Sequence, residues 1–375
     1  MTGDRDTCGC NGVRACTLCE ASHGRRAGQR LNVSRIRRVF VFCPKCRLCV
    51  EVDPVSGQQR SSLIKLPGIE VVEEAISEQD ESFLVECVEK APWNESQSGR
   101  RKQDFGPKVN FKKQRVKCDA FRGFPPYMDT VMRSFSTLDV DSMRNFEPVE
   151  LCNLKYSPER GSCIDPHFDD WWLWGERLVT LNLRGATVLT FSRAQDFNDL
   201  TQPYAESEGT DENGSEPRYA LTSDLIQEAS RSHCCTRQMS AEHLQEARKN
   251  YGEDFPDLPN RGPSAKQTQD AFSNCQIVPD DNEMMNSCLE ESGLDNLRGQ
   301  AGDVVHVALP RRSVVLVAKE ARFKWHHSVL REHVREIRLA MTVRDLSHTF
   351  LDPQNELEFA LGRQLLERSK INPDL

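Results

Sequence analysis

From Ile337 to Arg344 the chain reads Ile-Arg-Leu-Ala-Met-Thr-Val-Arg, with four large apolar side chains alternating with polar or small ones. Side chains two residues apart on a β-strand share a face, so this segment predicts a strand with Arg338 and Arg344 on one face. The apolar face suits packing against other elements, and only Ala340 and Thr342 separate the two guanidinium groups. Arginine pairs with carboxylates through two parallel N–H donors, so this face suits a dicarboxylic acid. A solvent-facing strand whose arginines meet surface acids is the alternative.

A second motif, His167-Phe168-Asp169, lies far upstream. On a strand His167 and Asp169 point the same way and can present an imidazole and a carboxylate to one metal ion. A distant third ligand would complete a triad of two histidines and one carboxylate, which leaves positions open on Fe(II) for cosubstrate and dioxygen. His326 and His327 precede the arginine strand and are the candidates for that ligand. Because such a pair alone occurs by chance, the interpretation depends on the arginine strand.

Together these residues resemble the AlkB-like family of Fe(II)- and 2-oxoglutarate-dependent dioxygenases. In that family a distant histidine and two arginines follow the HxD pair, as His327, Arg338 and Arg344 do here, and this order favours His327 over His326. The resemblance is closer to the branch of AlkB homologue 4 and covers most of the chain outside residues 194–302. The stretches that carry it are Gly99–Phe111, Pro158–Ser162, Ile164–His167 and Trp172–Leu178.

The resemblance implies an α+β fold, with a double-stranded β-helix (jelly-roll) core and flanking helices. It implies that His167, Asp169 and His327 bind iron. Dioxygen and 2-oxoglutarate would be the other reactants, and oxidation of an N-methyl group would release it as formaldehyde and leave the free amine. The cofactor would supply this chemistry, while the protein orients the substrate in a dry pocket.

For the cosubstrate, the resemblance implies that Arg338 pairs with the far carboxylate of 2-oxoglutarate and Arg344 with the carboxylate near the metal. Tyr156 would donate a hydrogen bond to it. The chain departs from the family here, because the family places an asparagine two residues before this tyrosine. Leu154 has that position and Asn153 lies three residues before, which leaves open whether Asn153 contacts the cosubstrate.

The substrate has two candidates. The branch of AlkB homologue 4 is associated with demethylating a monomethylated lysine of actin, and thereby with actomyosin and cytokinesis, and with N6-methyladenine in DNA. We expect a methylated protein, with actin the first candidate, because an acidic segment opposes broad phosphate binding. Trp171, Trp172 and Trp174 could line a methyl-group pocket or belong to the core. Methylated DNA or RNA is the alternative, and a non-catalytic interaction protein with a degenerate barrel is the second.

Cysteines crowd the N-terminal residues 1–52. The first set has the spacing CxC-x5-CxxC and consists of Cys8, Cys10, Cys16 and Cys19. Four thiolates at this spacing could hold one structural Zn(II), and a segment with so few large apolar residues would need such a staple. A flexible, reduced tail is the alternative. A second set, Cys43, Cys46 and Cys49, is incomplete as a separate site but could lend ligands to the first.

Composition sets the broad class. The chain has 375 residues with 15 cysteines, an odd number, and 38% hydrophobic residues, enough for one substantial core. No apolar run approaches a membrane span, and Met1-Thr-Gly-Asp does not begin a signal peptide. We therefore expect a reduced compartment, the cytoplasm and the nucleus, and no membrane partner. The resemblance adds actomyosin-rich structures such as the midbody, and we expect a monomer.

The predicted domain organisation follows from these patterns. The dioxygenase domain would occupy residues 65–193 and 303–350, with strands at 178–183, 186–191, 304–308 and 313–318, a helix at 71–90 capped by Ser77, and a basic hairpin at 100–117. That hairpin could contact phosphates, an acidic protein surface or solvent.

Residues 194–302 carry 21 acids against 8 bases, so we expect a disordered acidic insert with at most a short helix at 240–250. Residues 353–370 are expected to form a C-terminal helix.

Overall fold

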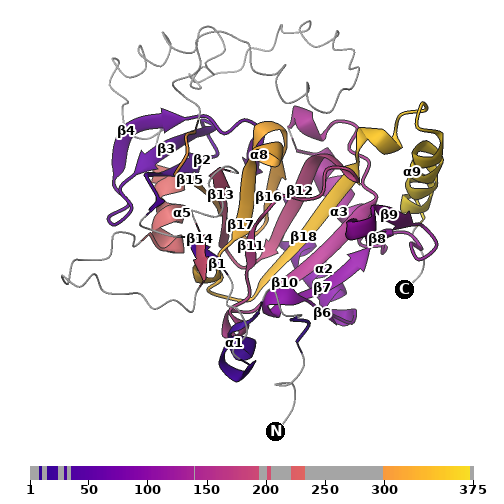
Figure 1. Ribbon diagram of the computed structural model, residues 1–375, viewed down its shortest axis with the longest axis horizontal. Helices are drawn as coiled ribbons and strands as arrows, with labels where there is room; N and C mark the ends of the chain where they lie inside the picture. The colour runs from indigo at the N-terminus through magenta and orange to yellow at the C-terminus, as the bar shows by residue number, and fades with distance from the viewer. Residues whose placement is uncertain are drawn as a thin grey trace, which may run out of the picture.

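The computed structural model describes residues 8–10, 15–23, 29–31, 35–138, 140–193, 201–203, 221–232 and 299–371. Within these residues two seven-stranded sheets form the body of the protein, and helices cover their outer sides (Figure 1). We call them the arginine sheet and the histidine sheet after the predicted site residues that each carries.

The arginine sheet is antiparallel throughout and contains the strand predicted at 337–344. In spatial order its strands are β5 (Ile69–Val72), β16 (Ser313–Val317), β12 (Trp174–Arg184), β18 (Arg338–Leu346), β10 (Glu150–Tyr156), β7 (Arg101–Phe105) and β6 (Asn94–Glu95). The central strand β18 pairs with β12 on one side and β10 on the other, so the arginine strand lies in the middle of the sheet.

The histidine sheet is antiparallel except where β15 runs parallel to β2. Its strands are β11 (Ile164–His167), β17 (Trp325–Val329), β13 (Thr187–Arg193), β15 (Asp303–Leu309), β2 (Arg38–Cys43), β3 (Leu48–Val52) and β4 (Gln59–Ile64). Two short ribbons accompany the sheets, β1 (Gln29–Leu31) with β14 (Thr201–Pro203) and β8 (Lys108–Asn110) with β9 (Arg115–Lys117).

Three hydrophobic clusters form three layers: an inner layer between the two sheets and one outer layer on the far side of each sheet. The inner cluster takes side chains from both sheets, among them Phe191 and Tyr156, so the sheets face one another across it. The outer cluster of the arginine sheet contains Leu339, Met341 and Val343, the apolar face predicted for β18. Opposite faces of one strand therefore serve different layers, and the period-two prediction is confirmed.

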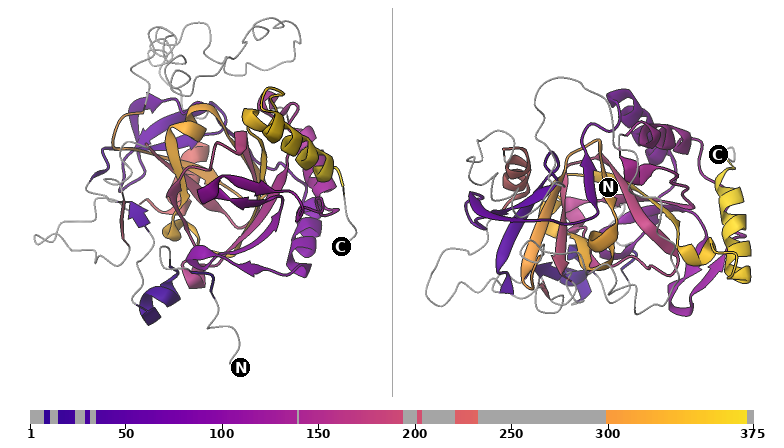
Figure 2. Two further views of the ribbon diagram at one scale, coloured as in Figure 1. Left: turned by 45° about the vertical axis from the view of Figure 1, so that its right-hand side comes forward. Right: turned by 90° about the horizontal axis from the view of Figure 1, so that it is seen from above.

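The helices are distributed to the two outer flanks. In every view α2 (Glu78–Lys90) and α9 (Glu356–Ser369) lie on the flank of the arginine sheet, away from β2 to β4 (Figures 1 and 2). Residues of α2, α3 (Met128–Ser136) and α9 enter the outer cluster of that sheet. The predicted C-terminal helix is confirmed within a few residues of its ends.

The helix expected at 71–90 begins later than predicted. Val71 and Val72 pair with β16 as part of β5, because two β-branched residues beside an exposed sheet edge gain ladder hydrogen bonds that a helix start would not give. Ser77 is the predicted cap: its hydroxyl accepts the amide N–H of Asp80 at 3.0 Å and leaves α2 to begin at Glu78.

The predicted hairpin at 100–117 is only half correct. Strand β7 pairs with β10 inside the arginine sheet, where buried Gln103 donates to the Val88 and Ala91 carbonyls, and only β8 and β9 form a hairpin of their own. The strands predicted at 178–183 and 186–191 form, but β12 and β13 belong to different sheets. The chain thus crosses between the sheets at Gly185-Ala186, one residue later than predicted.

The boundary predicted for the Cys-rich N-terminal segment, 1–52, is wrong because the segment ends earlier in the chain. Strands β2 and β3 are integral to the histidine sheet, and Phe40, Phe42 and Cys49 enter the inner cluster. Their alternating large side chains are buried on both faces, which a Cys-rich module outside the core could not provide. The described part of the Cys-rich segment outside the sheets is therefore confined to residues before β2.

The predicted insert, 194–302, is also partly wrong. Helix α5 (Ser223–Ser232) packs on β2, β13 and β15, where Ile226 is fully buried against Val39, Val41 and Val188. The prediction relied on the acidic net charge of the whole segment. That charge does not reveal this short amphipathic stretch, whose apolar residues recur at helical spacing. Residues 204–220 and 233–298, including the helix expected at 240–250, lie outside the described residues.

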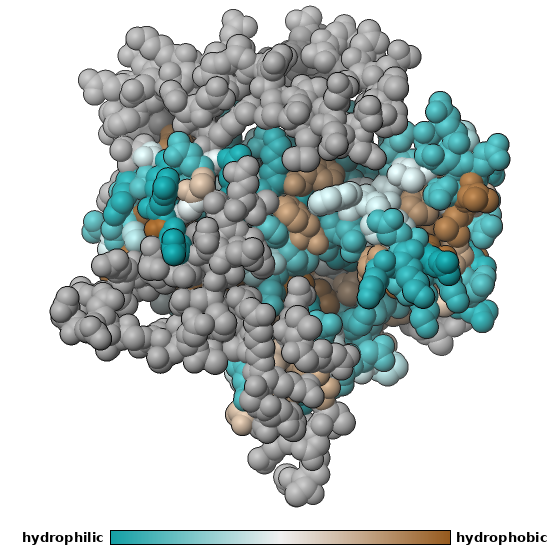
Figure 3. All heavy atoms as spheres, viewed as in Figure 1, coloured by the Kyte–Doolittle hydropathy of each residue, from teal (hydrophilic) through white to brown (hydrophobic). Residues whose placement is uncertain are grey.

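None of the helices in the described ranges combines the length and the apolar character needed to span a bilayer. The face shown in Figure 3 is mostly hydrophilic over the placed residues, with apolar patches near α8 (Lys319–Phe323) and α9. Phe323 and Leu357 are among the exposed large apolar residues of these helices.

The packing of α5 can be tested by truncation. Ile226→Ala should lower the free energy of unfolding by about 2–5 kcal/mol, because it removes a fully buried side chain and leaves a cavity. Glu228→Ala, on the exposed side of the same helix, is the control and should change stability by less than about 0.5 kcal/mol. Equal urea midpoints for wild type and Ile226→Ala would contradict the docked helix.

Candidate active site

Two paired strands bring the predicted metal ligands together. His167 ends β11 and pairs directly with His327 of β17, and Asp169 follows two residues after His167. One ligand atom from each of the three residues lies within 4.8 Å of the others. The two imidazole centroids are 4.4 Å apart, and His167 Nε2 is 3.6 Å from Asp169 Oδ1. The three residues form one donor set, as the sequence predicted.

The protonation state of this donor set fits a divalent cation. His167 Nδ1 lies 2.8 Å from the Asp165 carbonyl oxygen, which can only accept, so Nδ1 donates there and Nε2 is the nitrogen turned toward Asp169. His327 Nδ1 is buried and has no hydrogen-bond partner among the described residues. Burial and the neighbouring His167 lower the pKa of His327 to about 3, so it is neutral at physiological pH. Neutral imidazoles with one carboxylate are a ligand set for Fe(II).

Asp169 is held on both sides by arginine. Its Oδ2 accepts from Arg344 Nε at 3.0 Å, and its backbone carbonyl accepts from Arg322 Nη1 at 2.7 Å. Burial alone would raise the pKa of Asp169, but the Arg344 guanidinium and the two histidines hold it well below its usual range. The carboxylate is therefore ionised and fixed before any metal arrives.

Arg322, in α8, was not predicted from the sequence. Its side chain is fully buried, and burial lowers its pKa to about 10. It acts on the backbone of residues 169 and 170, not on a side-chain acid. No spacing or charge pattern marks such a contact, because an arginine that serves carbonyl groups has no acidic partner in the sequence.

The alternative histidine lies on the other side of the sheet. Along β17, His327 pairs with Phe191, which belongs to the inner cluster, so His326 points outward. There its ring stacks on Phe168 with centroids 4.2 Å apart. The geometry brings His327, and not His326, to His167 and Asp169.

The inner face of the arginine sheet carries the predicted cosubstrate residues. Arg338 pairs with Tyr156 across β18 and β10, its guanidinium lies 4.8 Å from the tyrosine ring, and its side chain is only 3% exposed. Its Nε donates to Asn182 Oδ1 at 2.7 Å. In the part of the chain that the structure describes, no carboxylate pairs with Arg338. Burial accordingly lowers its pKa, and such a buried cation is costly unless an anion joins it.

A second buried arginine, Arg100, lies by the same tyrosine. Its guanidinium is 5.9 Å from the Tyr156 ring, and its proximity contributes to lowering the pKa of Arg338. Arg100 Nε donates to the Gln97 carbonyl at 3.2 Å, and within the described ranges no acid pairs with it. The sequence placed Arg100 only in a basic hairpin, so this role was missed.

Arg344 already lies between two carboxylates. Its Nη1 donates to Glu150 Oε2 at 2.5 Å, in addition to the bond from Nε to Asp169. Glu150 was not predicted from the sequence; burial raises its pKa, and the Arg344 charge opposes that rise. A guanidinium has five N–H donors, so Arg344 can still donate to a further anion.

Asn153, whose role the sequence left open, points away from this pocket. It lies on the opposite face of β10 from Tyr156, and its Nδ2 donates to Gln103 and to the Tyr127 hydroxyl at 2.9 and 2.8 Å. Asn182 of β12 provides the amide next to Arg338 instead. The family's asparagine position is therefore not replaced by Asn153.

The N-terminal cysteines form the second donor set found in the described residues. Ligand atoms of Cys8, Cys10, Cys16 and Cys19 lie within 4.8 Å of one another. Cys43, Cys46 and Cys49 do not join this group: Cys43 and Cys49 are buried in β2 and β3 of the histidine sheet, and Cys46 lies in the turn between these strands. The suggestion that they lend ligands to the first set is wrong.

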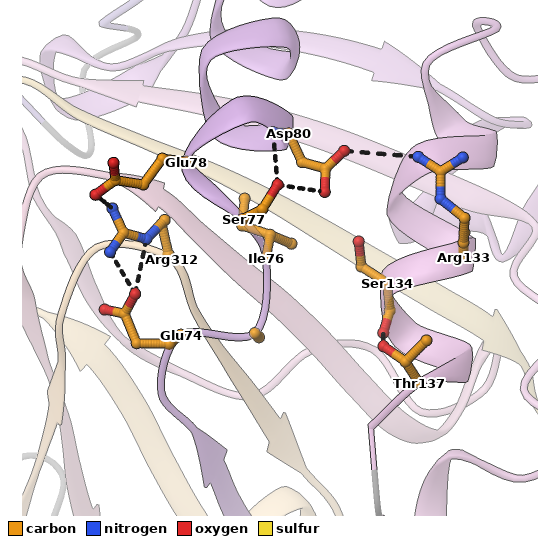
Figure 4. Close-up of a pocket in the computed structure, with 10 residues that line it drawn as sticks. Glu74, Ile76, Ser77, Glu78, Asp80, Arg133, Ser134, Thr137 and Arg312 are labelled. Carbon is orange, nitrogen blue, oxygen red and sulfur yellow. Dashed lines mark hydrogen bonds and ion pairs between the residues drawn. The ribbon is translucent and has the colours of Figure 1, made fainter.

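A cavity of about 590 Å³ lies elsewhere, between the start of α2, the end of α3 and Arg312 (Figure 4). Its walls are ion-paired: Arg312 binds Glu74 and Glu78, and Arg133 lies 3.6 Å from Asp80. None of the predicted site residues lines it. This cavity is therefore separate from the candidate site.

Two histidines and a carboxylate that could hold one metal ion, in a fold that also buries an arginine without a carboxylate partner among the described residues, are typical of Fe(II)- and 2-oxoglutarate-dependent dioxygenases. The chain is 31% identical over 364 residues to alpha-ketoglutarate-dependent dioxygenase alkB homolog 4 of Mus musculus, covering 96% of this chain and 93% of that protein. The Homo sapiens protein of the same name is 31% identical over 361 residues, with 96% and 92% covered. The chain thus belongs to the AlkB family, and it is an enzyme of that class.

Two other comparisons cover less of this chain. A DNA N6-methyl adenine demethylase of Caenorhabditis elegans is 34% identical over 211 residues, which are 51% of this chain and 72% of that protein. The solved structure of OsALKBH1 aligns over 75% of this chain and 99% of its own, with 10% identity and a TM-score of 0.33, too remote to bear on the assignment. No protein-family model matches the chain.

The choice between neighbouring histidines gives a direct test of the triad. His327→Ala should abolish stoichiometric Mn(II) binding, because it removes a ligand from a three-residue donor set. His326→Ala should bind Mn(II) like wild type, because that ring faces outward. Free Mn(II) measured by electron paramagnetic resonance during a titration distinguishes the two. Equal affinities in the two variants would show that the triad is assigned wrongly.

Proposed function

We propose that the space between the two sheets is the reaction chamber of an oxidative N-demethylase, and that the two sheets form the double-stranded β-helix of its class. The iron ligands would be His167, Asp169 and His327. The observation that carries this proposal is Arg338, a buried cation without a carboxylate partner among the described residues, on the same inner layer as the triad.

The cosubstrate fits this arrangement of charges. We assign the far carboxylate of 2-oxoglutarate to Arg338 and Tyr156, and the carboxylate near the metal to the remaining donors of Arg344. When bound, iron with 2-oxoglutarate and dioxygen supplies the oxidation: N-methylamine, 2-oxoglutarate and O2 give amine, formaldehyde, succinate and CO2. The protein's part is to fix the reactants and exclude water.

Each residue around the triad has a positioning task. The Asp165 carbonyl sets the His167 tautomer, and Arg344 and Arg322 fix the two ends of Asp169. Phe191 packs 6.3 Å from the His327 ring, and its cluster keeps the inner layer apolar. These contacts hold the ligand atoms in place without solvent reorganisation.

For the substrate we propose a methyl-lysine of a protein, with the monomethyl-lysine of actin as the first candidate. Phe168 lies between two proposed ligands, and its ring is 6.0 Å from that of Trp171, whose side chain is 58% exposed. Trp171 follows the proposed ligand Asp169 by two residues, and its exposed indole suits a methylammonium group that approaches from the outer side of the sheet, where Phe168 stacks on His326. Trp172 and Trp174 contribute to the outer cluster instead.

The relatives covering nearly the whole chain are alkB homolog 4 proteins. A role in actomyosin, in cytoplasm, nucleus and midbody, would follow.

Methylated DNA is the second candidate. Two observations favour it: the name of the Caenorhabditis elegans relative, and the basic surface formed by β8, β9 and the turn between them. Lys112, Lys113 and Arg115 are exposed on that surface, where they could contact phosphates. The non-catalytic alternative is set aside, because the donor set is complete and the relatives are named as enzymes.

Arg338 gives a test of the cosubstrate site. Arg338→Met should raise KM for 2-oxoglutarate at least about 30-fold, since losing one partner of a buried charge pair costs about 2–5 kcal/mol. Arg335→Met is the control, because Arg335 pairs with Asp224 at the exposed surface. Succinate release measures both. An unchanged KM in Arg338→Met would mean that 2-oxoglutarate binds elsewhere.

Competing substrates test the second half of the proposal. Wild type should release formaldehyde and succinate in equal amounts from an actin peptide carrying monomethyl-lysine, and His167→Ala should release neither. Trp171→Ala should raise KM for the peptide by about 2- to 30-fold, the value of a cation–π contact, without changing KM for 2-oxoglutarate. Turnover of N6-methyladenine DNA but not of the peptide would replace the lysine proposal with the nucleic-acid one.

A further inference from the structure

The N-terminal donor set lies in a segment that has almost no apolar core of its own. The cluster around it contains Cys10, Cys16 and Cys19, the methyl group of Ala15 and the partly buried Cys8. Its helix α1 (Thr17–His23) has only seven residues, too short to be stable alone. A segment this small needs a cross-link or a metal to keep one structure.

We propose that these four cysteines hold one structural Zn(II) as thiolates, and that this zinc module braces the cosubstrate pocket. Their ligand atoms lie within 4.8 Å of one another, with Cys8 Sγ and Cys19 Sγ 2.9 Å apart. Zn–S bonds of about 2.3 Å in a tetrahedron put sulfur atoms about 3.8 Å apart, which lies inside this 4.8 Å range and requires Cys8 and Cys19 to separate slightly. We call the described residues 8–10 and 15–23 the zinc module.

The module packs tightly on the segment that precedes β7. A Cβ atom on Gly99 would lie 2.8 Å from Cβ of Cys16 and 2.9 Å from that of Arg160, so only glycine permits this approach. Gly99 also has a φ of 68° and ends η2 (Gln97–Gly99), and its carbonyl accepts from the Ser162 hydroxyl at 2.8 Å. The next residue, Arg100, is the second guanidinium beside Tyr156.

A partly buried ion pair attaches the module to a second region. Glu20 of α1 accepts from Arg331 Nη2 at 2.6 Å and from Nη1 at 3.0 Å, and both side chains are 17% exposed. Arg331 Nε also donates to the Gly161 carbonyl at 3.2 Å. A Cβ atom on Gly161 would lie 2.6 Å from Thr17 Cγ2. One arginine thus joins the module to two loops at once.

These contacts reach the strand ends that carry the site. Gly161 lies just before β11, which ends at His167, and Arg331 follows β17, which carries His327. Arg100 is the residue that directly follows η2. The module therefore restrains both histidine strands and the arginine that adjoins the cosubstrate residue Tyr156. Its bracing role rests on the proposed cosubstrate pocket, whereas its zinc content does not.

Metal analysis of the purified full chain tests the zinc site. The measurement uses His167→Ala, so that zinc in the iron triad cannot be counted. We expect one zinc per chain in this variant and none when Cys16→Ser and Cys19→Ser are added. Absence of zinc from His167→Ala, or iron at the cysteines in its place, would overturn the site.

Glu20→Gln tests the brace while leaving all four cysteines in place. Zinc content should stay at the wild-type level, and the Kd of the Mn(II)-loaded protein for 2-oxoglutarate, measured by calorimetry, should rise about 3- to 10-fold. Glu86→Gln breaks the exposed pair with Lys90 and should leave both values unchanged. An unchanged Kd in Glu20→Gln would overturn the brace. If Arg338→Met also left Kd unchanged, the fault would lie in the pocket assignment and not in the zinc site.

Discussion

The chain of charges from Glu150 through Arg344 to Asp169 ties the two sheets together at the site. Arg344 belongs to β18 in the arginine sheet, and Asp169 follows the edge strand of the histidine sheet. All three side chains are at most 15% exposed, so removing one partner would leave an uncompensated charge in a poorly solvated place. The same guanidinium that fixes a proposed metal ligand thus fixes the distance between the sheets at this end. The position of the triad relative to Arg338 depends on it.

The rest of the site follows from β18 having two different faces. Its apolar face joins the outer cluster under α2 and α3, which fixes the strand in the middle of its sheet. Its polar face must then lie inward. There Arg344 pairs with two acidic side chains, whereas Arg338 pairs with none among the described residues. A fold that buries a cation in this way is stabilised by an anionic ligand, which links folding to cosubstrate binding. Cosubstrate binding and the stability of the fold therefore both depend on β18.

The sequence predicted the parts of the site that local periodicity carries. His167 and Asp169 are two residues apart on a strand, and β18 alternates cleanly, so their common faces followed from period two. It did not predict Arg322, Arg100, Glu150 or Asn182, because each acts through a contact with a residue far along the chain. The pairing of β10 with β18 that puts Glu150 opposite Arg344 has no local signal. Helix α5 was missed for another reason: a net acidic average over a long segment conceals a short apolar face, and only docking on β2 and β15 reveals its value.

The central claim is that one pocket holds both the metal and the cosubstrate. Anomalous diffraction from crystals grown without oxygen, with Mn(II) and 2-oxoglutarate, tests it most directly. We predict one manganese peak bound by His167, Asp169 and His327, with the far carboxylate of 2-oxoglutarate on Arg338. A manganese peak away from these three side chains, or a cosubstrate carboxylate on another cation, would contradict it.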